Sequence, residues 1–253
     1  MILAAGLGTR LRPLTDSRPK ALVEINGRTL LEITLARLRA FGVSEVIVNI
    51  HHFAGMVVDY LKSHDNFGMS IQISREDDLL LDTGGGLKKA SWFFLENAHH
   101  SSPGTRHLLN GSFVLHNVDV ISTIDLHRML HFHNECGALA TLAVQSRQSS
   151  RLLLFNDQLR LCGRATPGQP VNSPLVTRHS PLPLAFSGIH IISPRLLPML
   201  TEQGVFSIID AYLRLAAQGE KILAFRADEY YWRDLGRPAD LSQAALDLQQ
   251  GKL

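Results

Sequence analysis

The sequence predicts an α/β fold with a mainly parallel sheet and helices on both faces. One observation behind this prediction is that short apolar runs alternate with segments of helical periodicity through the first 145 residues. Another is that residues 138–144 form an almost continuous apolar run, which is typical of a strand buried on both faces of a sheet. Repeated strand–helix–strand units of this kind build a parallel sheet through right-handed crossovers.

Helices are expected where apolar residues recur at helical spacing and a helix-ending residue follows. Residues 29–41 show this pattern, with Arg37 and Arg39 toward the end. Gly42 follows directly, and glycine readily adopts the left-handed conformation that ends helices. The same criteria predict helices over residues 54–62, 84–96 and 126–135, and strands over residues 1–5, 45–50, 70–74, 112–117 and 138–144.

The pattern changes after residue 145. Two apolar runs, residues 151–155 and 159–162, flank a turn-forming sequence and predict a hairpin. We expect one domain over residues 1–253, in which a smaller part, residues 146–253, packs on the larger part, residues 1–145. The remaining expected elements are an irregular proline-rich loop over 166–183, strands over 184–192 and 221–226, a helix over 206–218 and a last helix that begins at Pro238.

The composition excludes several classes of protein. The 25 Lys and Arg residues nearly balance the 23 Asp and Glu residues, so a net charge of +2 gives no strong field that attracts nucleic acid or an anionic membrane. No apolar run approaches the roughly 18 residues that a membrane span needs. The sequence begins without a basic leader, and its 2 cysteines cannot form a disulfide framework. We therefore expect a cytoplasmic protein without nucleic-acid or membrane partners.

A glycine-containing loop, residues 6–15, directly follows the first expected strand. Ligands of parallel sheets bind beyond the carboxyl ends of the strands, and glycines let backbone N–H groups approach phosphate oxygens. Arg10 and Arg12 add positive charge, and Lys20 can reach the same phosphates. Leu11 stands where the dinucleotide-binding fingerprint has its third glycine, so that motif is excluded.

The motif Gly-x-Gly-Thr-Arg-Leu-x-Pro-x-Thr at residues 6–15, followed by Pro-Lys at 19–20, resembles the signature of the sugar-1-phosphate nucleotidyltransferases. The resemblance implies a Rossmann-like, glycosyltransferase-A-type fold and a reaction between a nucleoside triphosphate and a sugar-1-phosphate. It also implies that Arg10 and Lys20 are catalytic and hold the phosphates, with Lys20 contacting both substrates. The loop residues that it implies as nucleotide ligands are Ala4, Ala5, Gly6, Gly8 and Thr9.

Two aspartates far apart in the sequence are the expected metal ligands. Asp119 follows the strand expected over 112–117, and Asp234 lies in Trp-Arg-Asp-Leu-Gly at residues 232–236. Both segments are similar to metal-binding segments of the family, so the resemblance implies that the two carboxylates hold Mg²⁺, a hard cation that prefers oxygen ligands. The sequence departs from the family at Val118, where glycine is common, and a side chain there can narrow the site.

Three further segments are implied as substrate contacts. The sequence Thr-Gly-Gly-Gly at residues 83–86 allows close backbone approach to a flat ligand and exposes N–H donors, and the resemblance implies that Thr83, Gly84 and Gly85 bind the nucleobase. Asn117 aligns with an asparagine that contacts the sugar phosphate in part of the family. Gly188 lies in a segment similar to the sugar-side strand of the family.

The resemblance favours UTP and N-acetylmuramate-1-phosphate as substrates, because the compact length, the Thr-Gly-Gly-Gly segment and Asn117 are similar to that subgroup. Mannose- or heptose-1-phosphate with GTP is the second alternative, and phosphocholine with CTP the third. Two other classes stay open, namely a glycosyltransferase that consumes a nucleotide sugar and an inactive nucleotide-binding regulator. The sequence leaves open a monomer or a small homo-oligomer.

Overall fold

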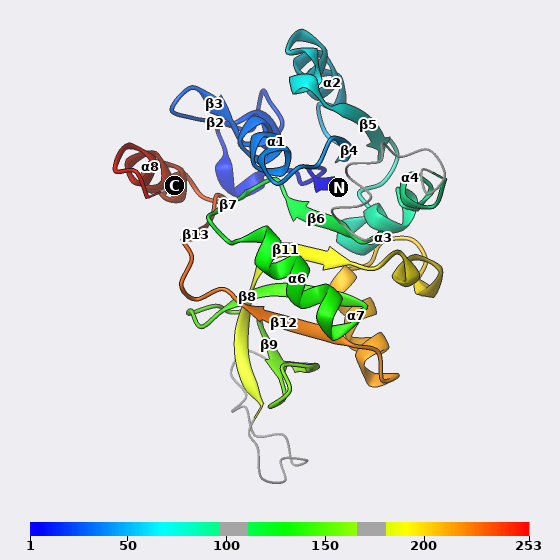
Figure 1. Ribbon diagram of the computed structural model, residues 1–253. Helices are drawn as coiled ribbons and strands as arrows, with labels where there is room; N and C mark the ends of the chain where they lie inside the picture. Colours follow the sequence, from blue (N-terminus) through cyan, green and yellow to red (C-terminus); the bar gives the residue numbers. More distant parts are fainter. Residues whose placement is uncertain (97–110, 166–180, 253) are drawn as a thin grey trace.

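The structure is a computed structural model that describes residues 1–96, 111–165 and 181–252 (Figure 1). Most of the proline-rich segment expected over 166–183 lies outside the described residues. A nine-stranded mixed sheet runs through the molecule. Its strands are β1 (Ile2–Leu3), β4 (Glu45–Ile50), β5 (Ser70–Arg75), β6 (Phe113–Asn117), β8 (Ala140–Gln145), β9 (Leu152–Phe155), β10 (Leu161–Arg164), β11 (Leu182–Ile192) and β12 (Ile222–Arg226).

The pairing of the strands fixes which ends of the sheet face the same way. β6, β1, β4 and β5 are neighbours in that order and pair in parallel. β11 is antiparallel to both β6 and β8, so β8 points in the same direction as β6. β12 is parallel to β8, and β9 and β10 form the antiparallel hairpin that the sequence predicts. The expected mixed α/β sheet is confirmed, and the carboxyl ends of β1, β6 and β8 lie at one edge.

Helices cover both faces of the sheet, as expected. Alternate residues of β4 enter two separate hydrophobic cores, Val46 and Val48 one of them and Ile47 the other. The first core also receives apolar residues of α1, α6 and α8, and the second receives those of α3 and α7. The described helices are α1 (Leu30–Ala40), α2 (Ala54–Ser63), α3 (Asp82–Lys89), α4 (Ser91–Glu96), α6 (Leu126–Cys136), α7 (Ile208–Ala217) and α8 (Pro238–Gln249).

The single helix expected over residues 84–96 is wrong, because the chain forms α3 and α4 with a turn at Ala90. Leu87 and Phe93 are both buried in the second core. Ala90 has φ −85° and ψ 2°, which departs from helical values, and its carbonyl oxygen accepts a hydrogen bond of 3.1 Å from the Phe93 N–H. The backbone at Ala90 therefore ends α3 and starts a new helix, α4.

Two small two-stranded sheets were not expected from the sequence. β2 (Glu24–Ile25) pairs with β3 (Arg28–Thr29), and β7 (Val120–Ser122) pairs with β13 (Trp232–Asp234). The second pair matters for the site, because it joins segments more than 100 residues apart in the sequence.

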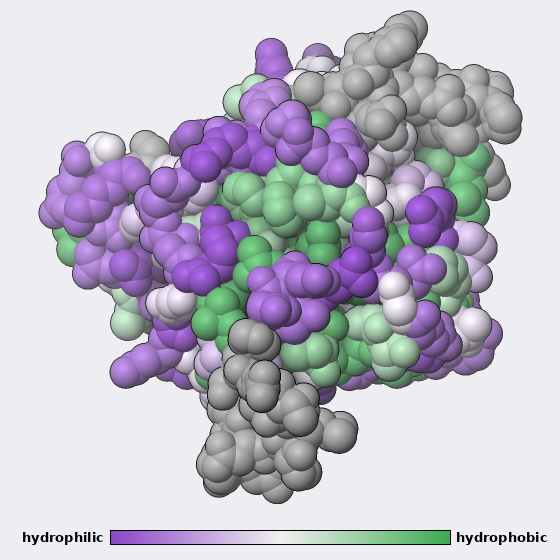
Figure 2. All heavy atoms as spheres, turned by 60° about the horizontal axis from the view of Figure 1, so that its bottom comes forward, coloured by the Kyte–Doolittle hydropathy of each residue, from purple (hydrophilic) through white to green (hydrophobic). Residues whose placement is uncertain are grey.

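The surface combines polar and apolar regions. Figure 2 shows one face, on which hydrophobic residues gather near the centre and hydrophilic residues border them. None of the helices in the described residues is both long enough and apolar enough to cross a membrane.

Candidate nucleotide and sugar-phosphate site

A cavity of about 590 Å³ lies beyond the carboxyl ends of β1 and β6, where parallel sheets bind ligands. A separate hollow of about 340 Å³ beside α1 contains none of the predicted site residues. Ten of the predicted residues line the larger cavity, namely Ala4, Ala5, Gly6, Gly8, Thr9, Arg10, Lys20, Thr83, Asn117 and Asp119.

The glycine loop is shaped by a left-handed residue and a buried anchor. Gly8 has a φ of 66°, and a Cβ atom there would lie 2.9 Å from Cγ2 of Thr15 and 3.2 Å from Cβ of Lys20. The Thr15 hydroxyl donates a hydrogen bond of 2.9 Å to the Gly8 carbonyl oxygen. Leu11 is fully buried and fixes the far side of the loop. Glycine is therefore required at position 8 on both conformational and steric grounds.

Lys20 and Asp119 form an ion pair across the cavity. The Lys20 ammonium donates to Oδ2 of Asp119, and the two side chains are only 9% and 20% exposed. Lys20 begins a short 3₁₀ turn, residues 20–22, and Asp119 lies between β6 and β7. The attraction between two opposite charges is stronger when they are partly shielded from water than when they lie on the surface. This attraction holds Lys20 beside Asp119, the carboxylate that is implied as a metal ligand.

The two predicted metal ligands converge through the β7–β13 pair. Asp234 is opposite Val120 in the strand register, and the Leu235 N–H donates a hydrogen bond of 2.8 Å to the Asp119 carbonyl oxygen. Burial raises the pKa of the Asp234 carboxyl, and the nearby negative charge of Asp119 raises it further. The two carboxylates therefore repel each other, as expected of ligands that share a cation.

Arg10 completes this cluster. The Gly236 N–H donates a hydrogen bond of 2.8 Å to Oδ1 of Asp234. A Cβ atom on Gly236 would lie 2.5 Å from both Nη2 of Arg10 and Oδ1 of Asp234, so the guanidinium and the carboxylate flank the same glycine. Arg10, Lys20, Asp119 and Asp234 are thus gathered at one place, although 224 positions separate the first from the last in the numbering.

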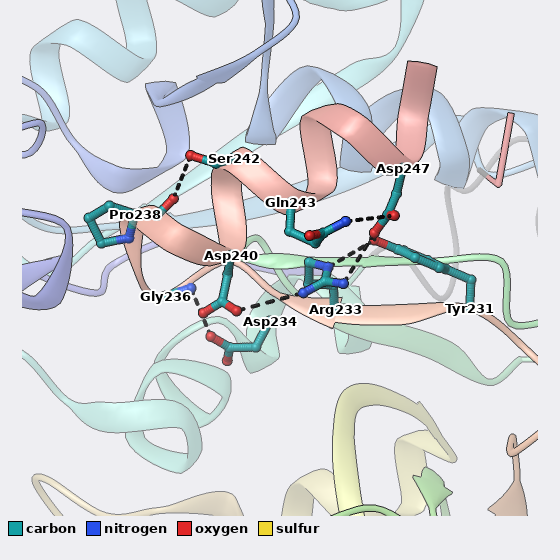
Figure 3. Close-up of polar contacts among 9 residues, drawn as sticks. All are labelled: Tyr231, Arg233, Asp234, Gly236, Pro238, Asp240, Ser242, Gln243 and Asp247. Atoms are coloured by element: carbon teal, nitrogen blue, oxygen red, sulfur yellow. Dashed lines mark hydrogen bonds and ion pairs between the residues drawn. The ribbon is translucent and has the colours of Figure 1, made fainter. Parts of the chain in front are cut away.

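The other side of β13 is fixed to α8 (Figure 3). Asp247, near the end of α8, is 2% exposed and accepts hydrogen bonds from the Tyr231 hydroxyl (2.8 Å) and from Nη2 of Arg233 (3.1 Å). The hydrogen bond from Tyr231 is the largest cause that lowers the pKa of Asp247 to about 2. Figure 3 shows Tyr231 and Arg233 pointing toward Asp247, whereas the Asp234 carboxylate points away from α8. Sequence reasoning did not identify Asp247, because one acidic residue on a surface-helix pattern carries no signal.

The Thr-Gly-Gly-Gly segment differs from its predicted arrangement. The N–H groups of Gly84 and Gly85 both donate to the Phe206 carbonyl oxygen, at 2.9 and 3.3 Å. A Cβ atom on Gly84 would lie 2.3 Å from the Phe206 ring, and one on Gly85 would lie 2.6 Å from the Gly204 carbonyl oxygen. The prediction that these two residues offer free N–H donors is therefore wrong, because they pack against residues 204–206. Thr83 lines the cavity, although its hydroxyl accepts a hydrogen bond of 3.0 Å from the Ile208 N–H.

Gly188 lies beside the cavity rather than in its lining. Its φ is 75°, and a Cβ atom there would lie 2.8 Å from Cγ2 of Val120 and 3.0 Å from Nδ2 of Asn117. Gly188 therefore makes room for Asn117, which lines the cavity itself. Val118 borders the cavity but is 4% exposed and belongs to the first hydrophobic core.

Sequence reasoning also missed Arg147 and Arg151. Arg151 lines the cavity, and the guanidinium carbon of Arg147 lies 3.7 Å from the centre of the Trp232 ring. Both arginines follow β8, whose carboxyl end lies at the same edge as that of β6. Ligands bind beyond the carboxyl ends of parallel strands, and this rule, which led to Asp119, applies to the loop after β8 as well. The direction of β8 is known, however, only once β11 is placed between β8 and β6.

Comparisons with known proteins agree with this fold. Residues 1–151 match the nucleotidyl transferase family. N-acetylmuramate α-1-phosphate uridylyltransferase of Caulobacter vibrioides is 32% identical over 244 residues, which cover 94% of this chain and 91% of that protein. Mannose-1-phosphate guanyltransferase of Kluyveromyces lactis is 28% identical over 248 residues, and the match covers 95% of this chain but 62% of that protein. A UDP-glucose pyrophosphorylase crystallised with UDP-glucose shares the fold, with a TM-score of 0.74, 17% identity and coverage of 99% and 97% of the two chains.

The chain therefore belongs to the nucleotidyl transferase family and, within it, to the sugar-1-phosphate nucleotidyltransferases. This result bears out the class that the glycine loop and the late Trp-Arg-Asp-Leu-Gly segment predict. The roles of the individual site residues stay predictions.

Proposed function

We propose that the enzyme transfers uridylyl from UTP to N-acetylmuramate-1-phosphate and releases pyrophosphate. The observation that supports this choice of substrates most is the relative from Caulobacter vibrioides, which bears that activity in its name and is matched over 91% of its length. The mannose-1-phosphate guanyltransferases are similar to this chain over a smaller share of their own length, 62% in Kluyveromyces lactis. GTP with mannose-1-phosphate is therefore the second candidate.

Asp119 and Asp234 are the residues that would hold Mg²⁺. Their chemistry fits the ion, since Mg²⁺ commonly takes one or two carboxylates together with substrate phosphates. Burial is the main cause of the raised pKa of Asp234, and the nearby charge of Asp119 adds to it, a repulsion that a shared cation would relieve. When bound, Mg²⁺ supplies positive charge that neutralises the triphosphate.

The reaction needs no general base, because the nucleophile is an ionised phosphate oxygen. That oxygen forms a bond to the α-phosphorus of UTP, and the bond from the α-phosphorus to the bridging oxygen of pyrophosphate breaks. Lys20 contacts both substrates and holds them in line, and Arg10 stabilises the charge that develops on pyrophosphate. Catalysis then depends on positioning and charge neutralisation.

The most informative test combines four nucleoside triphosphates with N-acetylmuramate-, mannose-, heptose- and glucose-1-phosphate and with phosphocholine, and measures pyrophosphate release. We expect the highest kcat/KM for UTP with N-acetylmuramate-1-phosphate. A maximum at GTP with mannose- or heptose-1-phosphate would establish the second candidate instead. Nucleotide binding without pyrophosphate release in every combination would identify an inactive regulator.

A further inference from the structure

The cavity contains a positive charge that the proposed reaction does not use. Its lining includes three cations, Arg10, Lys20 and Arg151. Lys20 is paired with Asp119, and Arg10 flanks Gly236 together with Asp234. The Arg151 guanidinium has no hydrogen bond or ion pair within the described part of the chain, where only its backbone bonds to Ser149. A free guanidinium on the wall of a ligand cavity is suited to bind an anion.

Arg147, in the same loop, is a second arginine whose charge is incompletely satisfied. Its Nη2 donates a hydrogen bond of 2.7 Å to the Phe186 carbonyl oxygen, and its guanidinium stacks on Trp232. Its Nε is buried and has no partner within the described residues, and neither has the buried hydroxyl of Ser187. Trp232 joins the two, because its Nε1 donates a hydrogen bond of 2.7 Å to the Ser187 carbonyl oxygen. Buried polar groups are normally hydrogen-bonded, so the Arg147 guanidinium, which lies outside the cavity lining, can still donate to a further acceptor.

The position of this loop in the sheet indicates which substrate it faces. The glycine loop follows β1 on one side of β6, whereas Arg147 and Arg151 follow β8 on the other side, beyond β11. Asn117, at the end of β6, lies between the two. The loop therefore borders the half of the site opposite the glycine loop, where the sugar-1-phosphate binds if the glycine loop binds the triphosphate.

We propose that Arg147 and Arg151 form a subsite for a carboxylate on the acceptor sugar, separate from its 1-phosphate. This inference rests on the proposed function and extends it, since it assigns the acceptor to the acidic sugars. N-acetylmuramate carries such a carboxylate on its lactyl group, and N-acetylglucosamine is the same sugar without that group. The planar guanidinium of arginine can bind a carboxylate through two parallel hydrogen bonds, which a lysine ammonium cannot do.

The test compares N-acetylmuramate-1-phosphate with N-acetylglucosamine-1-phosphate, each with saturating UTP, and scores the ratio of the two kcat/KM values. We expect the wild-type enzyme to prefer the acidic acceptor, and Arg151→Ala to lower the ratio by about 10- to 100-fold, the size of a charge-assisted hydrogen bond. Arg147→Lys keeps the positive charge but loses the planar guanidinium with its parallel N–H donors, and it should lower the ratio by several-fold. Arg195→Ala, an exposed arginine outside the cavity that pairs with Glu220, is the matched control and should leave it unchanged.

An unchanged ratio in Arg151→Ala, with an unaltered melting temperature, would overturn the inference. A higher KM for UTP in this variant, with the ratio unchanged, would instead assign Arg151 to the triphosphate. Failure of the proposed function is a different result, because the wild-type enzyme would then not use N-acetylmuramate-1-phosphate at all. In that case glucuronate- and glucose-1-phosphate form the test pair with the preferred nucleotide, and a wild-type preference for the uncharged sugar contradicts the inference.

Discussion

Lys20 and Asp119 form a partly buried ion pair in the lining of the cavity. The Lys20 ammonium neutralises the Asp119 carboxylate, and both side chains are mostly buried. In the proposed function the phosphate oxygens would be the new partner of the lysine, and Mg²⁺ would be the new partner of the carboxylate. The ion pair therefore leaves neither of the two partly buried groups as an isolated charge.

We predict that Lys20→Ala and Asp119→Ala are folded but nearly inactive. In the proposed reaction Lys20→Ala removes a charge that would contact the phosphates, and Asp119→Ala removes one that would hold Mg²⁺; losing such a contact commonly lowers kcat by about 10²- to 10³-fold. Steady-state pyrophosphate release gives kcat, and circular dichroism checks the fold. A folded variant that keeps more than about a tenth of the wild-type kcat would show that the assigned role is wrong.

Gly236 allows a separate test of Arg10. Gly236→Ala places a methyl group 2.5 Å from both Nη2 of Arg10 and Oδ1 of Asp234, so one or both side chains must move. Because both atoms are at the ends of side chains, we expect little loss of stability but a kcat at least about 10-fold lower. The matched control is Gly55→Ala in α2, where a Cβ atom meets nothing within 4 Å. Equal kcat values for the two variants would contradict the position of Arg10 beside Asp234.

At the level of elements, β13 connects the site to the C-terminal helix. Asp234 lies on this three-residue strand, and Tyr231 and Arg233 attach it to Asp247 of α8 (Figure 3). A two-stranded sheet is only marginally stable by itself, so β7 and β13 need support from neighbouring elements. We interpret the Asp247 network as the contact that orients Asp234, although Asp247 lies outside the cavity lining.

Asp247→Asn is expected to lower the melting temperature at pH 7 and to reduce kcat through the position of Asp234. The pKa of Asp247 is lowered to about 2 in the folded protein, against about 3.9 for an ordinary aspartate. Its contribution to stability is therefore complete above about pH 4 and is lost as the pH falls from about 4 toward 2. The stability difference between wild type and variant should accordingly shrink below about pH 4.

Thermal unfolding at a series of pH values measures this difference. Asp59→Asn, an exposed residue of α2, is the control and should behave like wild type throughout. A constant difference between Asp247→Asn and wild type from pH 7 to about pH 3 would contradict the ionic role of Asp247.

At the scale of the whole molecule, local periodicity predicted most of the elements and long-range contacts decided the rest. The strand over 45–50 was predicted with its observed ends, because a buried strand between two helices leaves a clear apolar run. The β7–β13 pair has no such pattern, since three residues are too few to show a period. Gly84 and Gly85 were expected to bind the nucleobase through open N–H groups, but the segment at 204–206, more than 100 residues away, fills the space beside them.

The residues of the candidate site likewise divide into those that local sequence predicts and those that depend on long-range contacts. Arg10, Lys20, Asp119 and Asp234 were found because their motifs are specific and each follows a recognisable strand or loop. Arg147 and Arg151 were missed because charged residues in a loop are ordinary, and their place in the site depends on the direction of β8. The division of the chain at residue 145 stays a prediction, although β11 and β12 of the later part complete the same sheet as β1, β4 and β6.

We propose that Asp119 and Asp234 meet at one cation beside the triphosphate. A crystal structure with Mn²⁺ and a non-hydrolysable UTP analogue tests it most directly, because the anomalous signal locates the metal. We predict one peak in contact with a carboxylate oxygen of each aspartate, with Lys20 and Arg10 on the phosphates. A metal bound elsewhere, with the two carboxylates not sharing it, would contradict the account.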